Sequence, residues 1–150
     1  MGLRLSKSQY EKLVKSKNKE IKPKKNKYRN NKITINGITY DSKKEYDRHR
    51  MLKVMEKSGS ISDLKFHDPS TNIILQENPK IKYEPDFCYY ENGIYIIEDV
   101  KGYQTKEFKL KKKMIIHKLN NNEIIGIFRL TKYSKDKGFV VIEEYKSKNL

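Results

Sequence analysis

Two acidic residues and a lysine stand where two expected strands end. Asp86 follows Pro85, and Asp99 is followed two residues later by Lys101. Because strand side chains alternate between the faces of a sheet, Asp99 and Lys101 share one face. An isolated Asp-x-Lys is typical of a surface salt bridge, but here the pair interrupts an otherwise apolar strand at its end. The sequence therefore predicts that two carboxylates and one ammonium converge at this place.

Such a group suits the metal-assisted hydrolysis of phosphodiester bonds. Two carboxylates anchor a hard divalent cation such as Mg²⁺, or Mn²⁺ as a substitute, and leave positions for water and substrate phosphate. The cation polarises the phosphoryl oxygen and helps to generate hydroxide. Lys101 then positions or deprotonates the water, or stabilises charge on the phosphorane.

The expected elements bring Asp86 and Asp99 together. Residues 81–88 and 94–101 are predicted strands, and the Glu91-Asn92-Gly93 turn between them predicts an antiparallel hairpin. The remaining expected elements are a hairpin over 33–40, a helix from 41 to about 57, strands over 61–67, 72–76, 123–130 and 139–144, and a helix from 105 to about 119. This order predicts an α/β fold with a mixed β-sheet flanked by helices.

Pro85-Asp86, followed after the hairpin by Asp99-Val100-Lys101, resembles the signature of the PD-(D/E)xK nuclease superfamily. The resemblance covers about residues 40–130. It implies a restriction-endonuclease-like core, a four-stranded mixed sheet between helices, and an Mg²⁺-dependent endodeoxyribonuclease activity. Residues 98–102, with a lysine-rich helix after them, are also similar to small phage nuclease-like proteins that are grouped with Holliday-junction resolvases.

The superfamily usually carries a further acid on the helix before the first core strand, and Glu45 is the matching residue. Glu45 shares a helix stripe with Leu52 and Met55, which should face the core. An acid on the buried side needs a partner, and a metal would serve. Ser42-x-x-Glu45 is also a capping box, so a role at the metal and a role in helix capping both stay open.

Three polar residues are candidates for supporting positions around this group. Alternation places Glu98 on the face opposite Asp99, and only a bulge in the strand would let it replace Asp99 as a ligand. Gln104 stands at the start of the second helix, where it could hold water or phosphate. His67 ends the first core strand, and we expect a hydrogen-bonded structural residue there rather than a general base.

The charge of the chain points to a polyanionic partner. The formal net charge is +15, from 34 Lys and Arg against 19 Asp and Glu. A membrane surface is the competing partner, but residues 1–30 lack the bulky apolar residues of a lipid-binding helix. DNA is therefore the expected partner. The candidate DNA-binding residues are Lys24, Lys25, Lys27, Arg29, Lys106, Lys109, Lys112 and Lys113.

Charge also divides the chain into segments. Residues 1–30 contain eleven Lys and Arg and two Glu, so we expect a basic, partly disordered arm that is either solvated or phosphate-binding. The nuclease domain is expected over 31–145, followed by a flexible tail over 146–150. No run of eighteen apolar residues and no secretory signal are visible, and Cys88 as the single cysteine excludes a disulfide within the chain. We expect a cytoplasmic protein without membrane association, located in the bacterial host if it is phage-encoded.

The leading hypothesis is a structure-specific endonuclease that acts on branched or Holliday-junction DNA in phage or mobile-element metabolism. The small domain leaves little room for reading sequence, and a homodimer would allow two strands to be cut. The rival hypothesis is a basic nucleic-acid-binding protein without catalysis, including a degenerate nuclease fold. Under the rival, Asp86 and Asp99 should fail to converge with Lys101.

Overall fold

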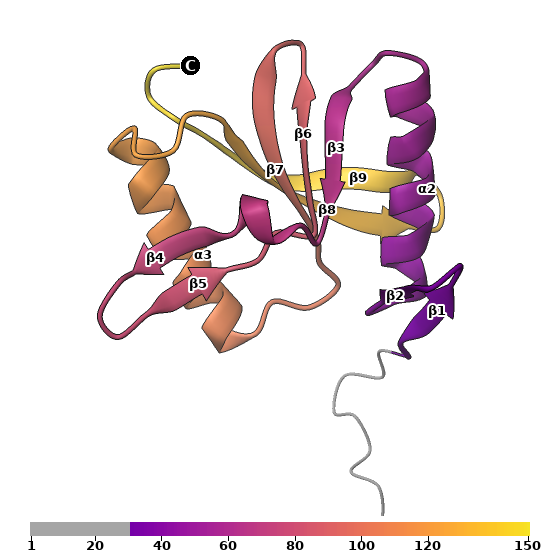
Figure 1. The fold of residues 1–150 in the computed structure, drawn as a ribbon, viewed down its shortest axis with the longest axis horizontal. Helices are drawn as coiled ribbons and strands as arrows, with labels where there is room; N and C mark the ends of the chain where they lie inside the picture. The colour runs from indigo at the N-terminus through magenta and orange to yellow at the C-terminus, as the bar shows by residue number, and fades with distance from the viewer. Residues whose placement is uncertain (1–30) are drawn as a thin grey trace, which may run out of the picture. The chain divides into compact units, whose positions relative to one another are not determined.

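The computed structural model describes residues 31–150, which form two helices and a mixed sheet (Figure 1). The order of the elements is β1 Ile33–Ile35, β2 Ile38–Tyr40, α2 Lys43–Lys57, β3 Ser62–Phe66, a 3₁₀ turn Pro69–Thr71, β4 Ile73–Gln76, β5 Ile81–Tyr83, β6 Phe87–Glu91, β7 Ile94–Val100, α3 Lys106–Asn120, β8 Ile127–Ser134 and β9 Gly138–Lys146. The expectation of an α/β fold with a mixed sheet is thus confirmed.

The central sheet has five strands in the order β3-β6-β7-β8-β9. The pair β7 and β8 is parallel, and the other neighbours are antiparallel. Helix α3 supplies the crossover between the two parallel strands, as such a connection requires. Two further pairs, β1 with β2 and β4 with β5, form small sheets of their own.

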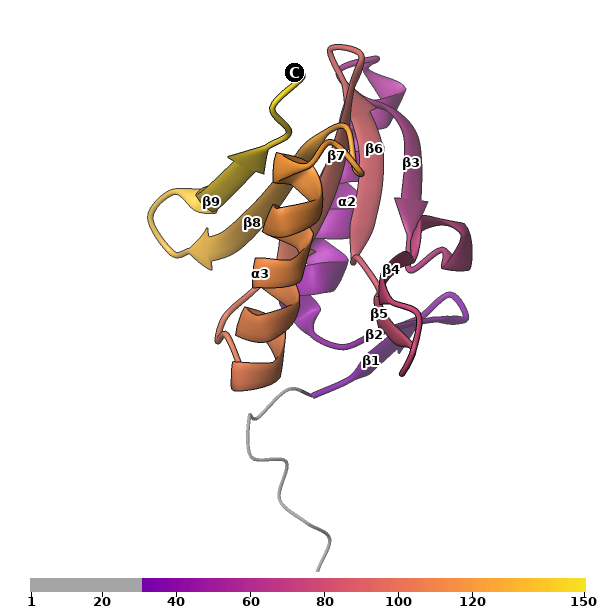
Figure 2. The same cartoon turned by 90° about the vertical axis from the view of Figure 1, so that its left-hand side faces the viewer.

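Alternation along the central strands produces two apolar clusters, one on each face of the sheet. Leu52 of α2 packs with Phe87, Tyr89 and Ile96. The opposite face is covered by α3, whose buried residues Phe108, Ile115 and Leu119 pack with Cys88, Ile97, Phe128 and Leu130. Figure 2 shows the sheet between the two helices. This stripe on α3 is the one that the helical period predicts.

Both helices begin at the residues that the sequence indicates. The Ser42 side chain accepts a hydrogen bond from the Glu45 amide, and the Thr105 side chain accepts one from the Phe108 amide. The β6–β7 hairpin is also confirmed. Its two-residue turn places Asn92 at φ 52° and Gly93 at φ 77°, the left-handed conformations that favour Asn-Gly.

One expected strand is in fact two. Residues 81–88 were expected to form a single strand, but β5 and β6 are separated by residues 84–86 and belong to different sheets. Pro85 has no amide hydrogen to donate to a sheet ladder, which explains the break. The sheet strand after α3 begins at Ile127 rather than at residue 123, because residues 121–126 form the turn that reverses the chain.

The end of the chain departs from the predicted flexible tail over residues 146–150. Strand β9 includes Lys146, and Ser147 is buried. The Ser147 amide donates to the Gly126 carbonyl over 3.0 Å, and the Asn149 amide donates to the Asn122 side chain over 3.0 Å. These contacts hold the segment against the turn before β8.

Within residues 31–150, neither helix has the length and apolar character that a membrane-crossing helix needs. The expected basic arm over residues 1–30, including Lys24, Lys25, Lys27 and Arg29, lies outside the described residues.

Candidate active site

The β6–β7 hairpin brings Asp86 and Asp99 together. Phe87 pairs with Glu98 in the ladder. Asp86, which precedes Phe87, and Asp99, which follows Glu98, therefore fall at the same end of the hairpin. The Val100 amide donates to Asp86 Oδ2 over 2.9 Å and fixes that carboxylate. Burial, and next the charge of Asp99, raise the pKa of Asp86 well above its ordinary value. The two carboxylates are therefore close enough to repel each other in the metal-free protein.

The two oxygens of Asp99 have different surroundings. Oδ2 accepts a hydrogen bond from the Tyr83 hydroxyl, whose pKa is raised by burial and by the Asp99 charge, so that Tyr83 stays a donor. Oδ1 is buried and accepts no hydrogen bond of ordinary geometry from the described residues. A buried carboxylate oxygen is costly unless a positive charge lies beside it, and the Lys101 ammonium supplies that charge.

Lys101 lies beside Asp99 and carries the neighbouring positive charge. Its Nζ is 3.0 Å from Asp99 Oδ1 as an ion pair and lies over the Phe108 ring, 4.6 Å from the centroid. Burial lowers the pKa of Lys101, but the charges of Asp99 and Asp86 outweigh this and raise the pKa above its ordinary value. Lys101 is therefore a cation in the metal-free protein rather than a base.

Glu45 caps α2, which is one of the two roles that its sequence position left open, and its carboxylate also contacts His67. Its amide donates to Ser42 Oγ over 3.2 Å, and its Oε2 accepts from the Asp41 amide over 2.6 Å, so the residue caps α2. Its Oε1 lies 2.7 Å from His67 Nε2, at the side where His67 Nε2 is 4.0 Å from Asp86 Oδ1. The buried carboxylate of Glu45 thus faces the site through His67.

His67 is a site residue that the sequence did not single out as functional. The hydrogen bond to Glu45 raises the pKa of His67 more than burial lowers it. The ladder pairs Phe66 with Phe87, so His67 falls next to Asp86. The pairing of two predicted strands was the only signal that could have indicated this position, because His67 shares no short motif with the other site residues.

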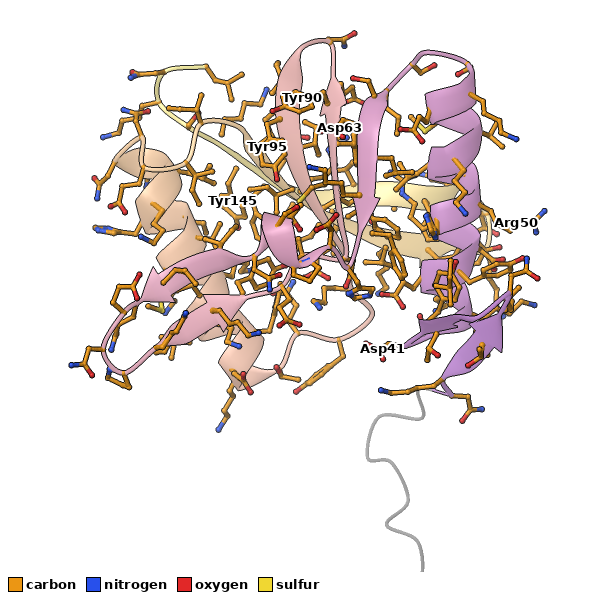
Figure 3. All side chains as sticks on the ribbon, viewed as in Figure 1. Asp41, Arg50, Asp63, Tyr90, Tyr95 and Tyr145 are labelled. Carbon is orange, nitrogen blue, oxygen red and sulfur yellow. The ribbon has the colours of Figure 1, made fainter. Side chains whose placement is uncertain are left out.

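The donor atoms of this region suit a divalent cation. Asp41, Glu45 and His67 each offer one ligand atom within 4.8 Å of the others, and Figure 3 shows Asp41 below the first turn of α2. Carboxylate oxygens dominate, with one imidazole nitrogen, a set that Mg²⁺ and Mn²⁺ accept. Of these three residues, Glu45 was among the predicted metal ligands, whereas Asp41 and His67 were not. The predicted ligand Asp86 lies beside the cluster, with its Oδ1 4.0 Å from His67 Nε2.

One family model matches the chain over residues 25–135. Its description is "Protein of unknown function (DUF1064)", and the matched residues include Glu45, Asp86, Asp99 and Lys101. The chain belongs to the DUF1064 family. No curated protein and no solved structure matches it.

Glu98 of this DUF1064 protein stands apart from the site. It lies on the opposite face of β7, as alternation predicts, and is fully buried. Arg48 of α2 donates to it twice, from Nε over 2.6 Å and from Nη2 over 2.9 Å. Tyr89 and Thr131 donate to the same carboxylate over 2.5 Å and 3.0 Å. Glu98 therefore fastens α2 to the sheet and is not the supporting residue at the metal that the sequence suggested.

The other residues proposed for phosphate contact differ in their surroundings. Lys112 donates to Glu143 and to Gln104, over 2.7 Å and 2.8 Å, and Gln104 also donates to Glu143 over 2.7 Å. Lys112 and Gln104 thus join α3 to β9 through Glu143 and do not contact Asp86 or Asp99. Lys106, Lys109 and Lys113 are exposed on α3.

A pocket of about 380 Å³ opens beside Asp99 and Lys101 in this DUF1064 fold. Its walls are β5 and the first turns of α3, and they contribute Lys82 and Lys111 among other residues. Neither lysine was among the predicted DNA-binding residues. The missing information was the position of the β4–β5 pair against α3, which local sequence does not encode.

The raised pKa of Asp86 has a consequence for stability. Folded Asp86 retains a proton that the unfolded chain has released above about pH 4. The unfolded state then binds fewer protons, so the free energy of unfolding falls as the pH rises toward the folded-state pKa. We expect Asp86→Asn to remove this decline, because asparagine keeps an acceptor for the Val100 amide without titrating.

Urea unfolding in EDTA at several pH values between about 5 and about 8 measures the effect. The variant should gain stability over the wild type as the pH rises. His67 also has a raised pKa but is present in both proteins, so the difference between them isolates Asp86. Parallel curves for the two proteins would contradict the close approach of the two carboxylates.

Proposed function

We propose that the protein is a divalent-metal-dependent DNA endonuclease with a restriction-endonuclease-like core. The observation that carries the proposal is the convergence of Asp86, Asp99 and the Lys101 ammonium at the end of one hairpin, with the Asp99 carboxylate buried. The sheet supports it as well, since the resemblance to PD-(D/E)xK nucleases implies a mixed sheet between helices. The net charge of +15 favours a polyanionic substrate.

The residues have distinct roles in the proposed reaction. Asp86 and Asp99 hold the cation, which when bound supplies Lewis-acid polarisation of the phosphoryl oxygen and an activated nucleophile. Lys101 is held as a cation by two carboxylates, so it stabilises the charge that develops on the phosphoryl group. Glu45 fixes His67 at the edge of the site, where an imidazole with a raised pKa can donate a proton to a leaving oxygen.

Branched DNA, including four-way junctions, is the proposed substrate class. The two helices and the sheet leave no separate domain for reading base edges among residues 31–150. Selection by DNA structure requires no such domain. A panel of linear, nicked, flapped and four-way DNA, each with Mg²⁺, with Mn²⁺ and with EDTA, tests both the activity and the substrate class.

Lys101→Ala should abolish cleavage of whichever substrate the wild type cuts, because it removes the ammonium beside Asp99 that stabilises the phosphoryl group. It should leave the rise in melting temperature caused by Mg²⁺ in place, since an ammonium is not a metal ligand. Lys132→Ala, which changes an exposed lysine on β8, is the matched control and should cleave normally. Full activity of Lys101→Ala would refute its role, and loss of the Mg²⁺ effect would show that Lys101 acts through the metal site.

Absence of cleavage by the wild type with either metal on the whole panel, combined with retained DNA binding, would replace the nuclease with the non-catalytic binding protein.

A further inference from the structure

Three hollows lie in a row along α3. The first, of about 380 Å³, opens at Asp99 and Lys101. The second, of about 410 Å³, shares Lys82, Glu107 and Lys111 with it. The third, of about 420 Å³, shares Met114 with the second and ends at Lys118. Because neighbouring hollows share residues, they form one groove, which we call the α3 groove.

The α3 groove runs between α3 and the β4–β5 pair, which Figure 1 shows beside each other. Most of its residues on α3 form one stripe at spacings of three and four, namely Glu107, Leu110, Lys111, Met114, His117 and Lys118, and Phe108 and Lys113 flank this stripe. From Thr105 to Lys118 this stripe extends for about 20 Å at the rise of an α-helix. The groove therefore leads away from the candidate catalytic residues over a length of several nucleotides.

The lining combines positive charge with apolar surface. Six lysines line the groove against four acidic residues, one of which is Asp99 itself. Lys82, Lys111 and Lys118 are held by Glu84, Glu107 and Glu123 over 2.6, 3.0 and 2.7 Å. Lys80 and Lys113 make no ion pair with any described residue, so they are available to an anion. Between the lysines lie Ile81, Met114 and Leu110, and Leu110 is 59% exposed.

We propose that the α3 groove holds a single-stranded DNA segment that enters or leaves the catalytic site. The lysines match phosphates, and the apolar residues between them match the faces of unstacked bases. In a duplex the base faces are stacked on one another, so they are not accessible to Leu110 and Met114. This proposal rests on the proposed function, because only a nuclease makes one end of the groove a catalytic site. It names flaps and branch points with unpaired strands as the preferred substrates.

Apart from Lys113, the lysines that line the groove are not the DNA-binding residues that the sequence suggested. Lys111 and Lys82 face it, whereas the exposed Lys106 and Lys109 line none of its three hollows. These two pairs differ in position but not in charge, which makes them a matched test.

The experiment measures binding in the full chain with Asp99→Asn added to prevent cleavage. Fluorescence anisotropy follows labelled single-stranded and duplex oligonucleotides of equal length over a range of salt concentrations. Lys82→Gln/Lys111→Gln should lower the slope of log affinity against log salt on single strands by about 1.4, which is two contacts at about 0.7 each. Lys106→Gln/Lys109→Gln should change this slope much less. Leu110→Ser should weaken single-strand binding several-fold with the slope unchanged, because it removes an apolar contact and no charge.

Three results would overturn the groove. These are equal slopes for the two lysine pairs, an equal effect of the groove pair on duplex and single strands, and unchanged single-strand affinity of Leu110→Ser. Because no cleavage is required, the two proposals fail separately. A wild-type protein that binds single strands through the groove and cuts nothing refutes the nuclease, whereas a nuclease indifferent to Lys82 and Lys111 refutes the groove.

Discussion

Asp99→Asn is expected to reduce metal-dependent cleavage by about three orders of magnitude in kcat/KM, which corresponds to about 4 kcal/mol of transition-state stabilisation. The substitution removes the charge of a proposed metal ligand but keeps an oxygen that accepts from Tyr83. The fold should therefore survive. DNA affinity should be unchanged or higher, because a negative charge near the substrate phosphate is removed. Mg²⁺ should no longer raise the melting temperature.

Asp63→Asn is the matched control for this experiment. Asp63 lies on β3, is exposed, and stands apart from the site in Figure 3, with only a 3.7 Å ion pair to Lys65. Its backbone has φ 52°, which asparagine adopts readily. The control should cleave as the wild type does. Near-normal cleavage by Asp99→Asn, with Asp63→Asn equal to it, would remove Asp99 from the metal site.

Arg48→Met should cause the largest loss of stability, about 3–5 kcal/mol in the free energy of unfolding. The Arg48 and Glu98 side chains are 7% and 0% exposed, so methionine would leave the Glu98 carboxylate buried without a counter-charge. The hydrogen bonds from Tyr89 and Thr131 remain, but they carry no charge. Urea unfolding measures the loss, and Arg48→Met/Glu98→Gln should recover part of it.

Arg50→Met makes the same chemical change on the outside of the same helix. Arg50 is exposed, points away from the sheet in Figure 3, and lies over the Tyr46 ring at 5.7 Å. Its loss should cost about 1 kcal/mol or less. If Arg48→Met were no more destabilising than Arg50→Met, the ion pair with Glu98 would not be what fastens α2 to the sheet.

Features encoded by neighbouring residues were predictable from the sequence. Ser42 and Thr105 cap the helices, and the Asn92-Gly93 turn fixes the hairpin register. The approach of Asp86 to Asp99 follows from that register and from strand alternation. Strand alternation also predicted correctly that Glu98 lies on the face opposite Asp99, although it did not identify Arg48 as its partner.

Features that depend on distant partners were not predictable. Arg48 and Glu98 are 50 residues apart, and nothing local marks them as a pair. Whether Lys109, Lys111 or Lys112 faces a substrate depends on where the β4–β5 pair and β9 lie against α3. The expectation of one strand over residues 81–88 concealed the change from one sheet to another, because both ends of this stretch are strands.

The break at residues 84–86 separates two hydrogen-bonded sheets of the domain. Before it, β4 and β5 bond only to each other, and after it, β6 enters the central sheet. The β4–β5 hairpin can therefore lengthen, shorten or be exchanged between related chains without altering a hydrogen bond of the five-stranded sheet. Chimeras that replace residues 72–82 would change one wall of the α3 groove, while Asp86, Asp99 and the Tyr83 hydroxyl that donates to Asp99 stay in place. Related chains that differ in the β4–β5 hairpin would therefore differ in the substrates they bind and keep the same catalytic residues.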